Sequence, residues 1–162
     1  MLRNIKMKTI ILCGGLGTRI SEETIKKPKP MVKVGKIPIL EHILNIYIKH
    51  GYDEFILATG YKNRIIENYF KSKKINAKIK CINTGKKTLT GGRIKRLKKY
   101  INKNENFMVT YGDGLSNVNI KKLINYHKSH RKIATMTIIH PPARFGEVII
   151  NNKSEIKKLK RN

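Results

Sequence analysis

A glycine-rich segment followed by basic residues is the strongest chemical signal in this sequence of 162 residues. Gly14, Gly15 and Gly17 follow an apolar run, and glycines let the backbone turn tightly and approach a ligand because they lack a Cβ atom. Arg19 adds a guanidinium group whose planar fork matches phosphate oxygens. Lys29 lies between two prolines, which restrict the backbone on either side of it. These residue types in this order indicate a binding site for a nucleoside triphosphate.

The spacing of the glycines differs from that of the two common phosphate-binding loops. A dinucleotide-binding fingerprint reads G-x-G-x-x-G and a Walker A loop reads G-x-x-x-x-G-K-[ST], whereas this segment reads G-G-x-G-T-R. Three glycines after a strand are by themselves consistent with an ordinary turn. The arginine and the Pro-Lys-Pro element that follow favour a functional loop.

The elements that must position these residues follow an alternating pattern of apolar runs and amphipathic helices, which predicts an α/β fold with a mostly parallel sheet. Ligands bind beyond the carboxyl ends of the strands in such sheets, so we expect the glycine segment and Asp113 at one edge. Strands are expected at residues 9–12, 54–59, 77–82, 107–111, 133–139, 147–150 and near 155–159, and helices at 38–50, 64–71, 92–101 and 119–130.

Several motifs resemble those of the sugar-phosphate nucleotidylyltransferases, also called nucleotide-sugar pyrophosphorylases. The order of TGGR, TYGDG and PPxRFG is similar to the cytidylyltransferase branch of that family. The resemblance implies a Rossmann-like nucleotide-diphospho-sugar transferase fold, with helices on both faces of a mostly parallel sheet. It extends from residue 8 to about 159, and the matching stretches are LCGGLGTRISEET, KPKPMVKVG, GYK, NTG, TGGRIKR, TYGDG and PPARFGE.

The resemblance also implies roles for individual residues. Arg19 and Lys29 would be catalytic: Arg19 would stabilise the departing pyrophosphate, and Lys29 would contact the phosphates. Asp113 would bind Mg²⁺, a hard cation that prefers oxygen ligands. The sugar pocket would be lined by Arg144 and Gly146. The nucleotide would be held by Leu12, Cys13, Gly14, Gly15, Leu16, Gly17, Thr18, Thr88, Arg93 and Gly112, together with Arg19 and Lys29.

The implied reaction is attack of a glucose 1-phosphate oxygen on the α-phosphorus of CTP, giving CDP-glucose and pyrophosphate. Bringing two polyanions together requires cationic side chains and a divalent metal. The same reaction with another base or sugar, and nucleotide binding without catalysis, are the alternatives. The expected partners besides the substrates are a second copy of the chain or a complementary C-terminal chain.

The chain departs from the family pattern in length. It ends where the family has an E-K-P element and a second metal-binding aspartate, so residues 1–162 are expected to be the N-terminal portion of the domain, with residues 1–6 as an optional tail. The segment between Phe70 and Asn83 is also shorter than in the cytidylyltransferase branch, and Cys13 stands where alanine is usual. Asn83 replaces the common aspartate of D-T-G.

Composition narrows the function classes. The net charge is +26, and residues 71–103 hold thirteen Lys or Arg and no Asp or Glu, which favours contact with polyanions. Because lysine is abundant throughout and no RNA module, zinc pattern or helix-turn-helix is recognisable, a basic nucleic-acid-binding protein is the least favoured alternative. Without an apolar run of membrane-spanning length or a signal-peptide pattern, we expect a cytoplasmic protein without a membrane partner. Cys13 and Cys81 are expected to be buried thiols.

Overall fold

The computed structural model describes residues 7–15, 26–139 and 147–160. The chain divides into two compact units, residues 1–123 and 124–162, and each is described by itself. The predicted site residues within the described ranges all belong to the first unit.

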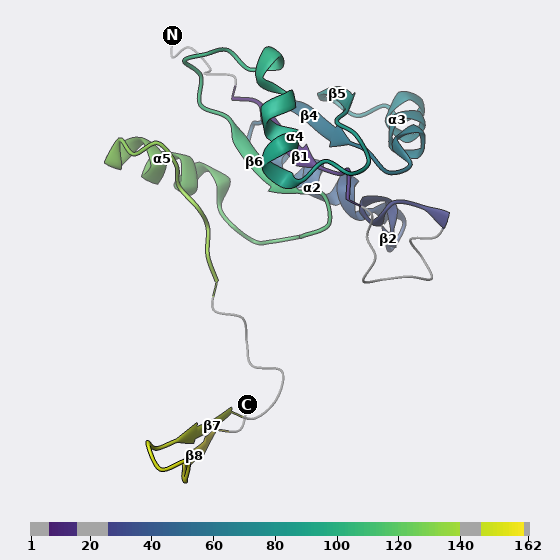
Figure 1. The fold of residues 1–162 in the computed structure, drawn as a ribbon. Coiled ribbons are helices and arrows are strands. Elements are labelled where there is room, and N and C mark those ends of the chain that lie inside the picture. The colour runs from purple at the N-terminus through teal and green to yellow at the C-terminus, as the bar shows by residue number, and fades with distance from the viewer. Residues whose placement is uncertain (1–6, 16–25, 140–146, 161–162) are drawn as a thin grey trace. The chain divides into compact units, whose positions relative to one another are not determined.

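A parallel sheet of four strands forms the centre of the first unit (Figure 1). Its strand order is β5-β4-β1-β6, so the first strand of the chain lies inside the sheet. All three pairings are parallel, with Ile10 of β1 opposite Ile56 of β4 on one side and Val109 of β6 on the other. Because β1 is buried on both faces, it reads as the continuous apolar run TIIL. The strands are β1 (Thr9–Leu12), β4 (Glu54–Thr59), β5 (Lys78–Asn83) and β6 (Met108–Tyr111).

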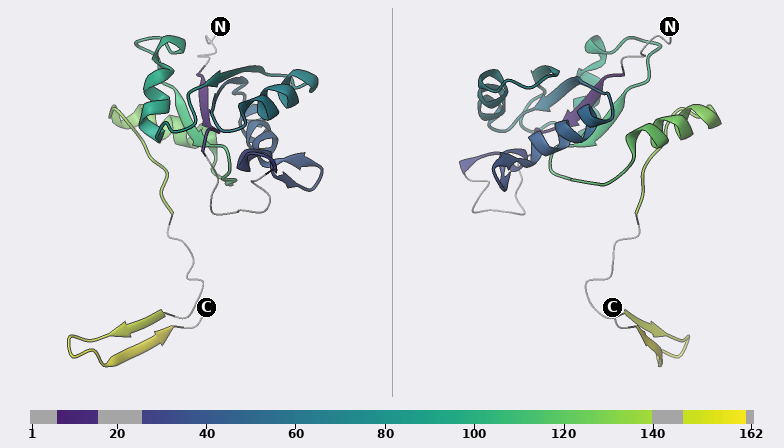
Figure 2. Two further views of the ribbon diagram at one scale, coloured as in Figure 1. Left: turned by 45° about the vertical axis from the view of Figure 1, so that its right-hand side comes forward. Right: turned by 180° about the vertical axis from the view of Figure 1, so that it is seen from behind.

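Helices cover both faces of this sheet, as the two views in Figure 2 show. On one face, α2 (Ile39–Lys49) packs with Tyr47 edge-on against Phe55 of β4. The adjacent α3 (Asn63–Ser72) is joined to α2 by a hydrogen bond from the Tyr69 hydroxyl to the buried Glu41 carboxylate. On the other face, α4 (Thr90–Arg96) and the 3₁₀ turn η2 (Lys98–Tyr100) complete a core of Ile10, Leu12, Ile56, Ala58 and Leu97.

Two small elements between β1 and α2 were not expected from the sequence. Lys29–Met31 form a 3₁₀ turn, η1, and the two-residue strands β2 (Lys33–Val34) and β3 (Ile37–Pro38) pair as an antiparallel hairpin. Gly35 turns this hairpin with φ +64°, a left-handed conformation that glycine adopts readily. The following helix α2 begins at Ile39, with Pro38 as its N-cap residue.

The predicted fold class is confirmed, but one helix has other bounds than predicted and one predicted strand is absent from the described residues. The helix expected at residues 92–101 begins at Thr90 and its α-helical part ends at Arg96. The strand expected at residues 133–139 is absent: this described segment pairs with no strand, and Ile133 is 103% exposed. Apolar residues alone do not make a strand when no neighbouring backbone accepts their hydrogen bonds.

The second unit contains most of α5 (Ile120–His130), which begins in the first unit, and an antiparallel hairpin. Its strands are β7 (Glu147–Ile150) and β8 (Ile156–Lys160), with the expected turn between them. The chain after α5 folds back onto the end of this helix. The Thr135 hydroxyl lies within hydrogen-bond distance of the rings of His127 and His130, at 2.9 and 2.8 Å.

Candidate functional site

The parallel sheet brings the carboxyl ends of its four strands to one edge. At this edge the amide of Cys13 donates to the carbonyl of Ala58 at 3.0 Å, and the amide of Gly112 donates to the carbonyl of Leu12 at 3.0 Å. The segments after β1 and β6 are therefore held side by side by backbone hydrogen bonds. Gly14, Gly15 and Asp113 lie at a common edge, as the sequence predicts for the described part of the glycine segment.

Lys29 and Asp113, two residues far apart in the sequence, form an ion pair at this edge. Lys29 Nζ lies 2.7 Å from Asp113 Oδ2, and the two side chains are 25% and 33% exposed. Lys29 is placed by η1, where Pro30 is buried beneath it. Asp113 is placed by the end of β6. The pair is close enough to solvent for either group to change partner when a ligand arrives.

Gly112 makes this placement sterically feasible. A Cβ atom at this position would lie 2.9 Å from the Cys13 sulfur and 3.1 Å from Pro30 Cγ. Both distances are shorter than normal van der Waals contacts. Glycine therefore lets the end of β6 approach β1 and η1 closely enough for Asp113 to reach Lys29.

The end of β1 presents backbone rather than side chains to the edge. Leu12 and Cys13 are buried in the core. The Cys13 thiol donates to the Ile11 carbonyl at 3.4 Å, and burial raises the pKa of this thiol well above its usual range. Gly14 is also buried, whereas Gly15 is exposed and has open space where a side chain would be. A ligand can therefore approach the backbone at Gly15.

Arg93 of α4 extends its guanidinium group between the ends of three strands. Its side chain is 4% exposed, and burial lowers its pKa. Nη1 donates to the Thr59 carbonyl at 3.2 Å and to the Thr84 hydroxyl at 2.7 Å. Nη2 donates to the Gly14 carbonyl at 2.7 Å and to the Lys86 carbonyl at 3.4 Å. One side chain thus joins the segments that follow β1, β4 and β5.

Thr88 lies beside this cluster and is held by a second arginine of α4. Arg96 Nη1 donates to the Thr88 hydroxyl at 2.8 Å and to the Thr84 carbonyl at 2.6 Å. Thr88 is half-buried, and the hydrogen bond from Arg96 holds its hydroxyl in place. Arg96 therefore fixes the segment after β5 from the exposed side of α4.

The remaining predicted site residues lie outside the described residues. They are the rest of the glycine segment and both predicted sugar-pocket residues: Leu16, Gly17, Thr18, Arg19, Arg144 and Gly146. Their roles stay predictions.

Three residues of the edge were given no role by the sequence. The Thr59 carbonyl accepts a hydrogen bond from Arg93, and Gly60 lies beside the guanidinium group of Arg93. The Thr84 hydroxyl accepts a hydrogen bond from Arg93 and donates one to the Thr59 carbonyl. Two of them belong to motifs shared with the family, Gly60 to GYK and Thr84 to NTG. The motifs marked the positions, but their role appears only when the strand ends are seen together.

The described residues contain no cluster of three or more His, Cys, Asp or Glu side chains that could hold a metal ion on their own. Asp113 supplies one carboxylate at the edge of the sheet. Mg²⁺ is commonly bound by one or two carboxylates together with substrate phosphates and water. The donor set therefore fits a cation that arrives with a nucleotide, and it does not fit an all-protein metal site.

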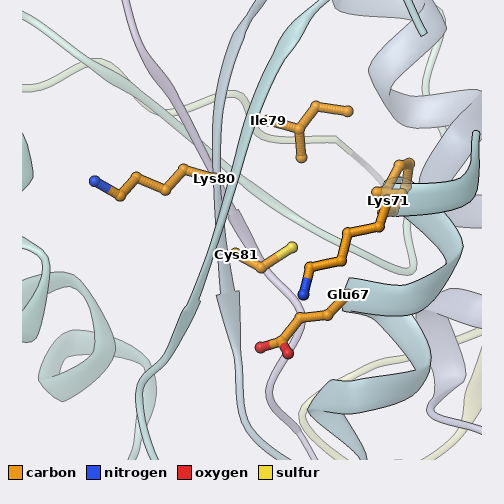
Figure 3. A pocket seen from close by; sticks show the side chains of 6 residues that line it. Glu67, Lys71, Ile79, Lys80 and Cys81 are labelled. Carbon is orange, nitrogen blue, oxygen red and sulfur yellow. The ribbon is translucent and has the colours of Figure 1, made fainter. Parts of the chain in front are cut away.

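A separate cavity of about 370 Å³ lies between α3 and β5 and includes none of the predicted site residues. Figure 3 shows Glu67 and Lys71 of α3 directed toward Cys81, while Lys80 extends to the other side of the strand. Burial, with a contribution from the Glu67 carboxylate, raises the pKa of Cys81 to about 11. The thiol is therefore protonated at neutral pH and poorly reactive.

A parallel sheet between two helical layers, with Gly14, Gly15 and a Lys–Asp pair at its carboxyl edge, defines a Rossmann-like α/β protein. A family model described as nucleotidyl transferase matches residues 8–160, and the chain belongs to this family. None of the helices in the described ranges is long and apolar enough to cross a membrane.

Two curated relatives and one solved structure illustrate the similarity. Glucose-1-phosphate cytidylyltransferase of Salmonella typhimurium is 43% identical and covers 89% of this chain, which spans 65% of that relative's length. D-glycero-alpha-D-manno-heptose 1-phosphate guanylyltransferase of Campylobacter jejuni is 40% identical, covering 72% of this chain and 52% of its own length. The crystal structure of HddC from Yersinia pseudotuberculosis complexed with GMP-PN has a TM-score of 0.65 at 26% identity, covering 96% of this chain and 69% of its own.

Proposed function

We propose that this chain forms the nucleotide-binding portion of a glucose-1-phosphate cytidylyltransferase, which makes CDP-glucose and pyrophosphate from CTP and glucose 1-phosphate. The observation that carries the proposal is the 2.7 Å contact between Lys29 and Asp113 beside the glycine turn. Both side chains have the chemistry that phosphate and a divalent cation require. The identity of 43% to a cytidylyltransferase supports the choice of base and sugar.

In the proposed reaction, an oxygen of glucose 1-phosphate forms a bond to the α-phosphorus of CTP. The bond from that phosphorus to the oxygen bridging to the β-phosphate breaks, and pyrophosphate leaves with the electron pair. The attacking oxygen is already anionic at neutral pH, so the chain needs no strong general base. Its main task is to place two polyanions in line and to neutralise their charge.

Lys29 would bind the phosphates of the nucleotide. Its ammonium group lies at the strand edge on a short, proline-flanked turn, which limits the motion of its backbone. Gly15 would let the nucleotide approach the backbone, because open space lies where a Cβ atom would be. Arg19, by the same proposal, would stabilise the leaving pyrophosphate.

Asp113 would hold Mg²⁺ together with the nucleotide phosphates. When bound, the metal would supply positive charge that stabilises the phosphates as charge develops on the leaving group. In its absence the Asp113 carboxylate forms an ion pair with Lys29. Among the described residues, Lys29 is therefore a positive partner of Asp113 before the substrates arrive.

A guanylyltransferase is the alternative function within the same family, because the Campylobacter relative is nearly as similar over the part of this chain that it covers. Binding measurements with CTP and GTP separate the two functions. A second copy of the chain, a complementary C-terminal chain and a cytoplasmic location stay predictions from the sequence.

Thermal unfolding of the purified chain with each of CTP, GTP, UTP, dTTP and ATP, with and without Mg²⁺, tests the proposal. A ligand present at a hundred times its Kd stabilises the folded state by about 2.7 kcal/mol. For a chain of this size that is a rise in Tm of roughly 5–10 °C. We expect a rise that is largest for CTP and depends on Mg²⁺. A cooperative transition that no nucleotide shifts would overturn the proposal, and a rise specific to GTP would favour the alternative.

A further inference from the structure

The hydrogen bonds of Arg93 occupy both terminal nitrogens of its guanidinium group. An arginine side chain offers five N–H donors, two of them on each terminal nitrogen. Nη1 has two protein acceptors and Nη2 has two. The terminal nitrogens are therefore engaged by protein before any ligand binds.

The acceptors around Arg93 are carbonyls and a hydroxyl instead of a carboxylate. The salt bridges found among the described residues involve other groups. A buried charge is costly unless hydrogen bonds replace its water. Because those bonds come from three separate segments, the guanidinium group remains satisfied only while all three keep their positions.

Two glycines leave room for this guanidinium group. A Cβ atom at Gly14 would lie 1.9 Å from Arg93 Nη1, and one at Gly60 would lie 2.7 Å from the same nitrogen. Gly15 has open space instead. The glycines therefore have different roles. Gly14 and Gly60 leave room for the Arg93 guanidinium group, whereas Gly15 leaves space that a ligand can enter.

We propose that Arg93 is a positioning residue that fixes the backbone at Gly14 and so prepares the adjacent Gly15 to bind the nucleotide. The inference rests on the proposed function only for the identity of the ligand, since the restraint on Gly14 follows from the contacts. This role is additional to the direct contact with the nucleotide that is expected from the sequence, which stays a prediction.

Hydrogen exchange at the Tyr61 amide, followed by NMR, tests the restraint without a ligand. This amide donates to the Gly14 carbonyl at 3.4 Å, the same oxygen that Arg93 contacts. In Arg93→Lys the charge remains but a single nitrogen cannot reach all of the acceptors. We expect protection of the Tyr61 amide to fall about tenfold or more, as local opening becomes easier.

Arg96→Lys is the matched control for the exchange experiment. Arg96 lies on the same helix and bonds to Thr84 and Thr88 but not to Gly14. We expect it to leave the protection of the Tyr61 amide within about twofold of the wild type. Equal protection in Arg93→Lys, Arg96→Lys and the wild type would overturn the inference.

Gly14→Ala provides a second variant that keeps Arg93 and displaces its guanidinium group. The matched control is Gly91→Ala, because Gly91 lies in α4 with open space where its Cβ would be. We expect loss of protection at Tyr61 only in Gly14→Ala. The wild type gives a third readout: immobilised Arg93 should show separate Nη proton signals, and signals averaged by rotation would contradict the inference.

Titration calorimetry with CTP and Mg²⁺ then connects the restraint to binding. We expect Arg93→Lys to weaken the affinity for CTP about tenfold or more, as a misplaced binding loop would. If the wild type binds CTP and Arg93→Lys binds it equally well, the inference fails while the proposed function stands. If the wild type binds no nucleotide but Arg93→Lys loses protection at Tyr61, the proposed function fails and the restraint on the turn stands.

Discussion

Replacing Lys29 by methionine should change the affinities for metal and for nucleotide in opposite directions. In the chain without ligands, the Lys29 ammonium group lies 2.7 Å from Asp113 Oδ2. A divalent cation must displace this ammonium group to reach the carboxylate. Methionine keeps much of the side-chain volume but removes the competing charge. Metal binding in the absence of nucleotide should therefore become stronger, and nucleotide binding should become weaker.

The size of both effects follows from the geometry of the pair. Because the two side chains are 25% and 33% exposed, water screens the pair, and such ion pairs contribute about 0–1 kcal/mol. The free energy of unfolding should therefore fall by no more than about 1 kcal/mol. Relief of the competition should raise metal affinity by up to about fivefold. A charge-assisted hydrogen bond to a phosphate contributes about 1.5–3 kcal/mol, so CTP affinity should fall about 10- to 150-fold.

Electron paramagnetic resonance of free Mn²⁺ gives the metal affinity, and calorimetry with CTP and Mg²⁺ gives the nucleotide affinity. Lys33→Met is the matched control, because Lys33 is an exposed residue of β2 and forms none of the ion pairs described. Both affinities of Lys33→Met should stay near those of the wild type. The reasoning would be refuted if metal and CTP affinity fell together in Lys29→Met, or if neither changed.

Three further predictions concern the same edge and the two thiols. Asp113→Asn should abolish the Mg²⁺ dependence of the rise in Tm produced by CTP, and a dependence that persists would remove Asp113 from the metal site. Gly112→Ala should lower the free energy of unfolding, measured by urea denaturation, by about 1–3 kcal/mol, because the new Cβ atom would lie 2.9 Å from the Cys13 sulfur. In the control Gly114→Ala the new Cβ atom faces open space, and the loss should be less than about 0.5 kcal/mol. As the pH rises from the ordinary thiol pKa of 9.0 to the raised pKa of about 11 of Cys81, the free energy of unfolding should fall, because the unfolded state loses the thiol proton first. This fall should be smaller in Cys81→Ser. An unchanged dependence of stability on pH in that variant would contradict the assignment.

Local sequence patterns predict the central elements well. Because β1 is buried on both faces, its unbroken apolar run was enough to predict the strand from the sequence. The strand β4 is buried in the same way and matches its predicted boundaries. The helix α2 carries a regular apolar stripe that ends near Gly51, whose φ of +90° suits the end of a helix. Residues close together in the sequence specify these elements, and the periodic pattern of apolar residues is therefore enough to predict them.

The failures arise where contacts distant in the sequence decide the structure. Residues 133–139 have the composition of a strand but no pairing partner in the described chain. The hairpin of β2 and β3 has only two residues in each strand, too few for any period to be recognised. The burial of Arg93 against Gly14 and Thr59 was likewise not predicted, because nothing local in the sequence indicates these contacts.

The position of β1 inside the sheet has a consequence for the order of events during synthesis. β1 is synthesised before β6, yet the two strands pair through Thr9 and Met108, toward the far end of the first unit. The contact between Gly14 and Arg93 spans 79 residues. Such non-local contacts form late, since the long intervening loop must close before they contribute. The carboxyl edge of the sheet should therefore be the last part of the first unit to assemble, and the apolar β1 should remain open to aggregation until then.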